Sequence, residues 1–272
     1  MDNHNQKIAF IGGGNMAQAI VGGLVRSGHA PQCLAVSDPD PTQHERIHLI
    51  HGSINVTNEN DALADEADIV VLAVKPQILA TVVSAITGRE SCLYLSIAAG
   101  ITLNSLQSLL EPARAIVRVM PNQPALVGAG MSVLTATSTT TEEQKASAQY
   151  VAEAMGDTDW VDDEALMDAV TAVSGSGPAY FYLFMEIIET CARDMGLPAE
   201  LARKLARQTC LGAGLVAVES DQPFDALRAS VTSKGGTTAA AIDVLEQSEF
   251  RAIVARALLT ARDRSVELSK MG

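Results

Sequence analysis

The stretch IAFIGGGNMA, residues 8–17, decides the fold of this chain. Four apolar residues typical of a buried strand lead into the pattern G-x-G-x-x-A, formed by Gly12, Gly14 and Ala17. Gly12 permits a tight turn, Gly14 lets the backbone approach a pyrophosphate, and Ala17 lets the next helix pack close to the strand. The N-terminus of that helix then faces the negative charge. This pattern predicts the dinucleotide-binding turn of a Rossmann domain.

The segments after this turn alternate short apolar strands with amphipathic helices. The expected strands are 8–11, 34–37, 69–73, 93–97 and 115–119, and the expected helices are 16–27, 42–50, 77–86, 103–109 and 142–155. Continuously apolar strands suit a parallel sheet that is covered on both faces. The alternation therefore predicts an α/β fold with a doubly wound, mainly parallel sheet. A less regular stretch at 129–135 is expected to add an edge strand.

From about residue 163 onward the pattern is helical only. The expected helices are 165–173, 180–195, 199–219, 224–231, 237–245 and 250–268. The sequence thus predicts two domains: a Rossmann domain at 1–162 and an all-α substrate-binding and dimerisation domain at 163–272. Several helices, such as 208–218, are apolar on more than one side, and a bundle of about 110 residues has little means to cover them. A homodimer is therefore expected as the minimal unit.

Composition and charge exclude several classes of partner. The formal net charge is −13, which argues against nucleic acid or an anionic membrane, because both require a basic surface. No apolar run reaches the roughly 18 residues of a membrane helix, and the polar start does not read as a signal peptide. The four cysteines form no CxxC pair, so neither a disulfide framework nor a metal site is expected. These features predict a cytoplasmic protein.

The histidines limit the chemistry of the second half. All five lie at or before His51, so residues 52–272 contain none. A local Ser-His pair or histidine metal site is therefore impossible there. The second half must rely on backbone groups, hydroxyls or lysines.

The end of the second expected strand bears on the choice of nucleotide. Asp38 lies where NAD enzymes carry the acid that binds the ribose, and it would repel a 2′-phosphate. Ser37 could instead donate a hydrogen bond to that phosphate, with Asp38 turned outward before Pro39. The residues alone leave NADPH and NADH both open.

Three further positions are candidates for the nucleotide site. The small residues Ala73 and Ala98 follow the strands 69–73 and 93–97 at the edge where such sheets bind ligands. Lys75 reads either as a general acid or as a surface lysine before a helix that starts with proline. Asn60 reads either as a helix cap or as a contact to the adenosine side.

Two segments of the helical half are unusual for a plain bundle. SGSGPAY at 174–180 marks a tight break between helices, or simple punctuation of the chain. VTSKGGTT at 231–238 places glycines and then hydroxyls at a helix start. Free N–H groups, the positive end of the helix dipole and neutral donors favour a carboxylate pocket there. An ordinary threonine cap after a glycine turn is the alternative.

Together these motifs resemble the pyrroline-5-carboxylate reductase family. The resemblance runs from end to end, through residues 12–17, 72–77, 119–126, 172–180 and 227–246, and the last segment is its most specific part. It implies reduction of the cyclic imine 1-pyrroline-5-carboxylate to L-proline, the last step of proline biosynthesis, usually with NADPH and with NADH possible. It also implies a C-terminal helical domain that interleaves with a second subunit.

The resemblance also implies roles for individual residues. The substrate carboxylate would bind at Ser233, Gly235, Gly236 and Thr237, and Thr238 would hydrogen-bond the ring nitrogen as the catalytic residue. The cofactor would be lined by Gly12, Gly13, Gly14, Asn15, Met16, Ser37, Asn60, Ala73, Val74, Lys75 and Ala98. Because a protonated imine is already electrophilic, a site of amides and threonines without histidine suits hydride transfer.

Two positions depart from the family pattern, and two other functions compete. Lys234 stands where many members have proline, and Gln123 follows Met-Pro-Asn in place of threonine. A hydroxy-acid reductase of the same layout usually has a lysine on the first long helix of its second domain, but residues 162–193 contain none. A non-catalytic nucleotide-sensing module would keep residues 12–17 without needing the segment 235–238.

Overall fold

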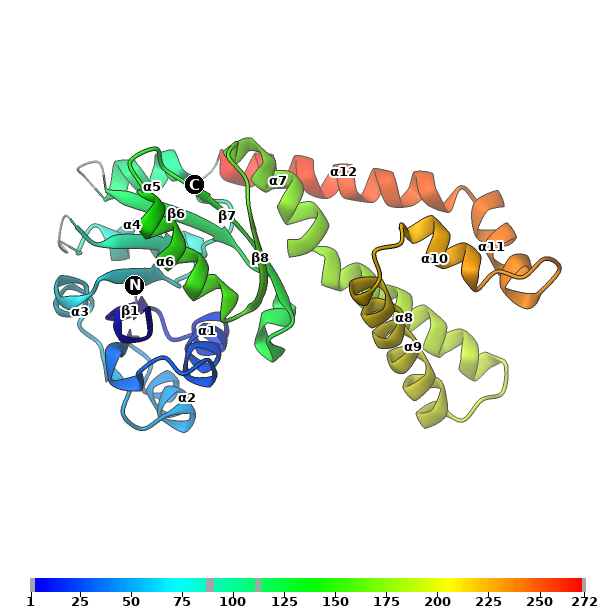
Figure 1. The fold of residues 1–272 in the computed structure, drawn as a ribbon, viewed down its shortest axis with the longest axis horizontal. Helices are drawn as coiled ribbons and strands as arrows, with labels where there is room; N and C mark the ends of the chain where they lie inside the picture. The colour runs from blue at the N-terminus through cyan, green and yellow to red at the C-terminus, as the bar shows by residue number, and fades with distance from the viewer. Residues whose placement is uncertain (1–2, 87–90, 111–113, 271–272) are drawn as a thin grey trace. The chain divides into compact units, whose positions relative to one another are not determined.

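The structure is a computed structural model, and it describes residues 3–86, 91–110 and 114–270. The chain divides into two compact units (Figure 1). The sheet unit comprises Met1–Gly175 together with Ala261–Gly272, and the helical unit comprises Ser176–Thr260. The boundary expected after residue 162 marks the point where strands give way to helices. The contact-based division does not test it, so it stays a prediction.

The sheet unit is built on an eight-stranded sheet in the order β3-β2-β1-β4-β5-β6-β7-β8. Its strands are β1 (Ile8–Ile11), β2 (Leu34–Ser37), β3 (Asn55–Thr57), β4 (Ile69–Leu72), β5 (Leu93–Ser96), β6 (Ala115–Met120), β7 (Gly130–Ala136) and β8 (Gly156–Trp160). The first six are parallel, β7 is antiparallel to β6, and β8 is parallel to β7. The predicted mainly parallel sheet is confirmed.

Helices cover both faces of this sheet. They are α1 (Asn15–Arg26), α2 (Pro41–Ile50), α3 (Asn60–Glu66), α4 (Pro76–Val83), α5 (Leu103–Leu109), α6 (Glu142–Glu153) and α7 (Met167–Val170). One buried cluster joins α1, α2 and α6 to residues such as Phe10, and a second joins α3, α4 and α5 to residues such as Tyr94. The apolar strands are therefore buried from both sides, which confirms the doubly wound fold.

The strand expected at 129–135 exists, but its position differs from the expectation. β7 lies inside the sheet, because β8 pairs with it and forms the edge. In β8, Asp157 and Asp159 are exposed, whereas Gly156, Thr158 and Trp160 are partly buried. An edge strand with one solvated face needs no continuous apolar run, and this explains why the sequence pattern did not reveal β8.

A buried histidine joins the start of the chain to α6. His29 is 1% exposed; its Nε2 lies 3.1 Å from the carbonyl oxygen of Gln6, and its Nδ1 lies 3.1 Å from the Tyr150 hydroxyl. A carbonyl oxygen only accepts, so Nε2 carries the proton and Nδ1 accepts from Tyr150. Burial lowers the pKa of His29 below 6.5, and the backbone hydrogen bond opposes this only in part.

This lowered pKa predicts a loss of stability in mild acid. Below pH 6.5 the unfolded chain binds a proton at His29 that the native chain does not, so the free energy of unfolding falls as pH drops through this window. Thermal unfolding between pH 7.5 and 5.5 should show a smaller fall in Tm for His29→Gln than for the wild type. His48→Gln is the matched control, because His48 is exposed. An equal fall of Tm with pH in the wild type and in both variants would refute the lowered pKa of His29.

The helical unit contains no strand among its residues, all of which the structure describes. It comprises α8 (Gly177–Asp194), α9 (Ala199–Glu219), α10 (Phe224–Ser230), α11 (Thr237–Gln247) and most of α12 (Phe250–Ser269). The helix expected at 165–173 is instead a 3₁₀ turn, α7 and a π-helical turn at Thr171–Gly175. The last turns of α12 belong to the sheet unit, where Ser265 Oγ donates to Asp168 Oδ1 over 2.6 Å.

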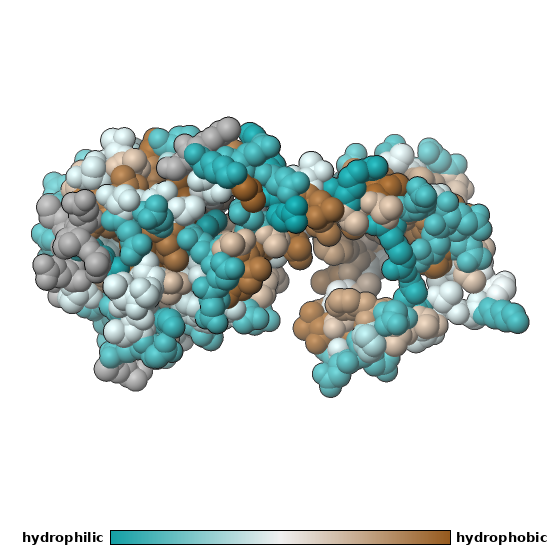
Figure 2. All heavy atoms as spheres, turned by 90° about the horizontal axis from the view of Figure 1, so that it is seen from above, coloured by the Kyte–Doolittle hydropathy of each residue, from teal (hydrophilic) through white to brown (hydrophobic). Residues whose placement is uncertain are grey.

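Apolar side chains lie at the surface of the helical unit (Figure 2). On α8, Phe181 is 63% and Leu183 is 57% exposed, and on α9 Leu211 and Leu215 exceed 50%. The buried residues of α8 and α9 are mostly alanines, and α10 and α11 have none. This unit therefore lacks an apolar core of its own. Among the described residues no helix is long and apolar enough to cross a membrane.

Candidate active site

The strand register brings the predicted nucleotide residues of the sheet unit to one edge. Ile11 at the end of β1 pairs with Ser37 of β2 and with Leu72 of β4, and Leu72 pairs with Ser96 of β5. The loops that follow these strands therefore start side by side. These loops contain Gly12, Gly13, Gly14, Ala73, Val74, Lys75 and Ala98, and the first of them leads into Asn15 and Met16 at the start of α1. The structure thus brings this group together at the carboxyl ends of the parallel strands.

The glycine turn has the geometry that its sequence requires. Gly12 adopts a φ of +104°, and a Cβ there would lie 2.6 Å from the carbonyl oxygen of Ala73. Gly14 has an ordinary φ of −67°, and a Cβ there would meet no atom within 4 Å. Gly14 is also the N-cap of α1, with no side chain capping the helix. Open space before an uncapped helix start is suitable for an anionic phosphate.

Ser37 and Asp38 differ in what they present at this edge. The Ser37 side chain is buried, and its Oγ has no hydrogen-bond partner. The Asp38 carboxylate is partly exposed and faces the glycine turn, because Oδ2 accepts from the Gly13 N–H over 2.7 Å. The alternative in which Asp38 turns outward before Pro39 is therefore wrong.

Lys75 and Asn60 lie at helix starts. Lys75 is the exposed N-cap of α4, directly before Pro76, which agrees with the reading as a surface lysine. Asn60 is the first helical residue of α3, and the N-cap is Glu59. Asn60 is therefore not the N-cap residue, and its contact to the adenosine side stays a prediction.

The predicted substrate loop lies in the helical unit, between α10 and α11. Gly235 adopts a φ of +73°, and the Gly236 N–H donates to the carbonyl oxygen of Ser233 over 3.0 Å. α11 begins at Thr237 without a side-chain cap. In the part of the chain that the structure describes, no acceptor is recorded for the Thr237 or Thr238 N–H or for the Thr238 hydroxyl. These donors at a helix start can bind a carboxylate.

Ion pairs link the two helices that flank this loop with α12. Glu246 of α11 pairs with Arg251 of α12 at 2.6 Å and with Arg228 of α10 at 3.4 Å. The hydrogen bond from Arg251 is the main cause that lowers the pKa of the Glu246 carboxyl, so this group is ionised at neutral pH.

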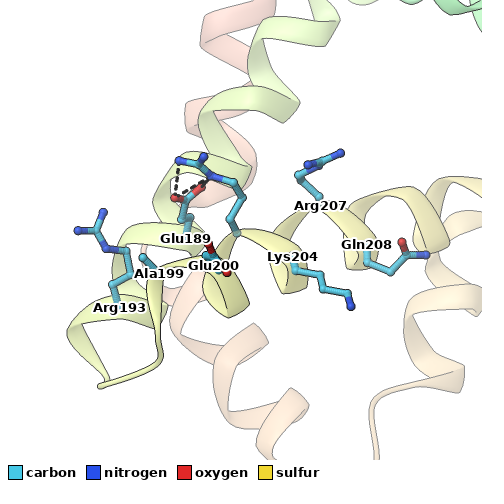
Figure 3. A pocket seen from close by; sticks show the side chains of 8 residues that line it. Glu189, Arg193, Ala199, Glu200, Lys204, Arg207 and Gln208 are labelled. Atoms are coloured by element: carbon cyan, nitrogen blue, oxygen red, sulfur yellow. Dashed lines mark hydrogen bonds and ion pairs between the residues drawn. The ribbon is translucent and has the colours of Figure 1, made fainter.

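A separate hollow between α8 and α9 contains none of the predicted site residues (Figure 3). Its charges include Glu189, which accepts from Arg203 of α9 over 3.2 Å. Lys204 and Arg207 extend from α9 in different directions (Figure 3). The charged side chains do not converge on one point, so the hollow is not a candidate active site.

Sequence reasoning missed two glutamine side chains whose hydrogen bonds support the glycine turn. Gln18 of α1 donates to the carbonyl oxygen of Gly13 over 2.7 Å and to Gln43 Oε1 over 2.9 Å. Gln43 of α2 in turn donates to Asp40. Both glutamines lie beyond the first residues of their helices, and the glycine pattern says nothing about those positions.

Comparison with known proteins gives matches in both units. A family model described as pyrroline-5-carboxylate reductase dimerisation matches residues 164–268, and one described as NADP oxidoreductase, coenzyme F420-dependent, matches residues 7–100. The pyrroline-5-carboxylate reductase of Pasteurella multocida is 43% identical over 98% of this chain and 98% of its own length. That of Haemophilus influenzae is 42% identical over 97% and 98%.

Solved structures agree with these matches. A pyrroline-5-carboxylate reductase from Coxiella burnetii has a TM-score of 0.92 at 39% identity, covering 97% of this chain and 98% of that one. The pyrroline carboxylate reductase of Plasmodium falciparum, with NADP bound, has a TM-score of 0.86 at 31% identity, covering 98% and 99%. The likeness therefore extends over the whole chain.

Proposed function

This chain belongs to the pyrroline-5-carboxylate reductase family. We propose that the predicted nucleotide residues of the sheet unit and the predicted substrate residues of the helical unit serve the same reaction. The reaction is the reduction of 1-pyrroline-5-carboxylate to L-proline by an NAD(P)H-dependent oxidoreductase, the last step of proline biosynthesis. The end-to-end identity of about 40% to curated reductases is the observation that carries this assignment. The names of its relatives are those of a biosynthetic enzyme, and this supports a cytoplasmic location.

The sheet-unit residues fit a nicotinamide dinucleotide, with NADPH or NADH as the hydride donor. The space in front of Gly14 would be filled by any Cβ, and the N-terminus of α1 opens into it. The turn from Gly12 to Met16 would hold the pyrophosphate through its backbone, and the loops at Ala73 and Ala98 would line the rest. The bound dinucleotide supplies hydride, and the chain supplies its position.

The helical-unit residues bind and orient the imino acid. The N–H groups of Gly235 and Thr237 hold the carboxylate, together with the Ser233 hydroxyl. Gly236 supports them indirectly, because its own N–H is engaged by Ser233 within the turn. The Thr238 hydroxyl bonds the ring nitrogen and fixes the imine carbon for hydride transfer. Because a protonated imine is already electrophilic, no strong protein acid is needed.

The chain forms a homo-oligomer whose minimal unit is a dimer. The exposed apolar side chains of α8 and α9 form a surface that a second copy would cover, and the matching family model describes dimerisation. Sedimentation of dilute protein should show a dimer at every concentration that retains activity. An active, folded monomer would refute this prediction.

One assay tests the function directly. Loss of NADPH or NADH absorbance on addition of 1-pyrroline-5-carboxylate should be rapid, and L-proline should be the product. A small 2-oxo acid in place of the imine should give no turnover, because the chain offers no lysine on α8 as a proton donor. Turnover of the 2-oxo acid without turnover of 1-pyrroline-5-carboxylate would identify a hydroxy-acid reductase instead.

A further inference from the structure

A closed ring of hydrogen bonds holds the Asp38 carboxylate against the glycine turn. Asp38 accepts from the Gly13 N–H at Oδ2 and from the Asp40 N–H at Oδ1, over 2.7 and 2.9 Å. Asp40 then accepts from Gln43, Gln43 from Gln18, and Gln18 also donates to the Gly13 carbonyl oxygen. The ring thus closes at Gly13, whose N–H donates to Asp38 and whose carbonyl oxygen accepts from Gln18. It fixes a carboxylate at the end of β2.

The backbone of Asp38 is fixed as well. Its N–H donates to the carbonyl oxygen of Thr57 in β3 over 3.0 Å, and its own carbonyl oxygen accepts from His44 Nε2 over 2.7 Å. Rotating the carboxylate away from the turn would therefore break two hydrogen bonds without a compensating movement of the chain. The group is preorganised rather than adaptable.

The neighbouring hydroxyl is not available to a phosphate. Ser37 is 2% exposed, and its Oγ is buried beneath other protein atoms. A 2′-phosphate outside the surface could not contact this atom without a rearrangement of β2. The choice between Ser37 as phosphate donor and Asp38 as ribose acceptor is thereby decided in favour of Asp38.

Arg46 is the first cation that follows the carboxylate along the chain. Residues 27–45 contain neither lysine nor arginine. Arg46 is exposed on α2, and its charge acts on Asp40, whose pKa is lowered first by the hydrogen bond from the Thr42 N–H. The end of β2 therefore presents two carboxylates, at Asp38 and Asp40. A 2′-phosphate there would be repelled, whereas a 2′-hydroxyl could donate to Asp38.

We propose that Asp38 makes this chain bind NADH in preference to NADPH, an inference that rests on the proposed nicotinamide-dependent function. The ribose diol donates to a carboxylate that the Gly13 and Asp40 N–H groups already hold in place. A 2′-phosphate would bring like charges together at the Asp38 carboxylate, because the charge of Arg46 acts on Asp40. Asp38 is a specificity-determining residue that acts on nucleotide binding rather than on hydride transfer.

The test is a direct measurement of nucleotide affinity with the full chain. The Kd values of NADH and NADPH are obtained from nucleotide fluorescence for the wild type, Asp38→Asn and Glu45→Gln. The wild type should bind NADH at least about tenfold more tightly, the order of one charge repulsion at a protein surface. Asp38→Asn should bring the two values within about threefold, because repulsion is lost while one oxygen still accepts.

Glu45→Gln is the matched control, since it removes one exposed carboxylate from the same helix region and should leave the ratio unchanged. Raising the ionic strength from about 0.05 M to about 0.5 M should narrow the wild-type ratio, because salt screens the repulsion. This measurement needs no variant, so a poorly folded Asp38→Asn would not weaken the test.

Two outcomes would overturn the proposal in distinguishable ways. If NADPH binds as tightly as NADH to the wild type, or if the ratio responds neither to salt nor to Asp38→Asn, Asp38 does not select the nucleotide and the reductase function still stands. If neither nucleotide binds, the proposed function fails together with the inference.

Discussion

Gly14→Val is expected to abolish nucleotide binding while the protein stays folded. A Cβ at Gly14 meets no protein atom within 4 Å, and φ of −67° suits any residue. The valine therefore occupies only the space in front of α1, where the pyrophosphate must approach the backbone. Losing two hydrogen bonds to a charged group, at about 1.5 kcal/mol each, weakens the affinity by about 100-fold or more. Nucleotide fluorescence measures the affinity, and thermal unfolding measures the fold.

Gly12→Ala serves as the control for stability, because it is expected to lower Tm where Gly14→Val does not. With φ of +104° and a Cβ placed 2.6 Å from the carbonyl oxygen of Ala73, the alanine strains the turn itself. It should destabilise the protein by about 1–3 kcal/mol and lower Tm. If Gly14→Val lowered Tm as much as Gly12→Ala, the open space at Gly14 would be structural and the site assignment wrong.

The strands that the sequence revealed are those buried on both faces. β1, β4 and β5 are fully buried runs of four residues, and such runs are typical of strands in a parallel sheet that is covered on both faces. β3 was missed because it has three residues, none of them buried. β8 was missed for the related reason that its side chains alternate at the edge. Position within the sheet, which local sequence does not encode, decided these cases.

The same distinction applies to the site. The glycine turn was predictable because φ and close packing require specific residue types at Gly12 and Ala17. The contact of Gln18 with Gln43 was not, since it joins two helices that only the folded sheet brings together. The engagement of the Gly236 N–H by Ser233 was also beyond the pattern, because it depends on the backbone path of the loop.

Thr238→Ala should lower kcat/KM about 10- to 100-fold, the order expected for losing about 1.5–3 kcal/mol from a hydrogen bond to a charged group. The Thr238 hydroxyl does not cap α11, and alanine favours a helix, so stability should not fall. Nucleotide affinity should hardly change, because the residue lies outside the sheet unit. Steady-state kinetics with 1-pyrroline-5-carboxylate and thermal unfolding measure the two effects separately.

Two variants decide whether the hydroxyl itself is responsible. Thr238→Ser keeps the hydroxyl and should stay within about threefold of the wild type, because only a methyl group is lost. Lys75→Met should leave most activity, since an exposed helix cap outside the substrate loop is not needed when the imine arrives protonated. If Lys75→Met were inactive and Thr238→Ala near the wild type, the proton donor would lie in the sheet unit, and the role given to Thr238 would be wrong.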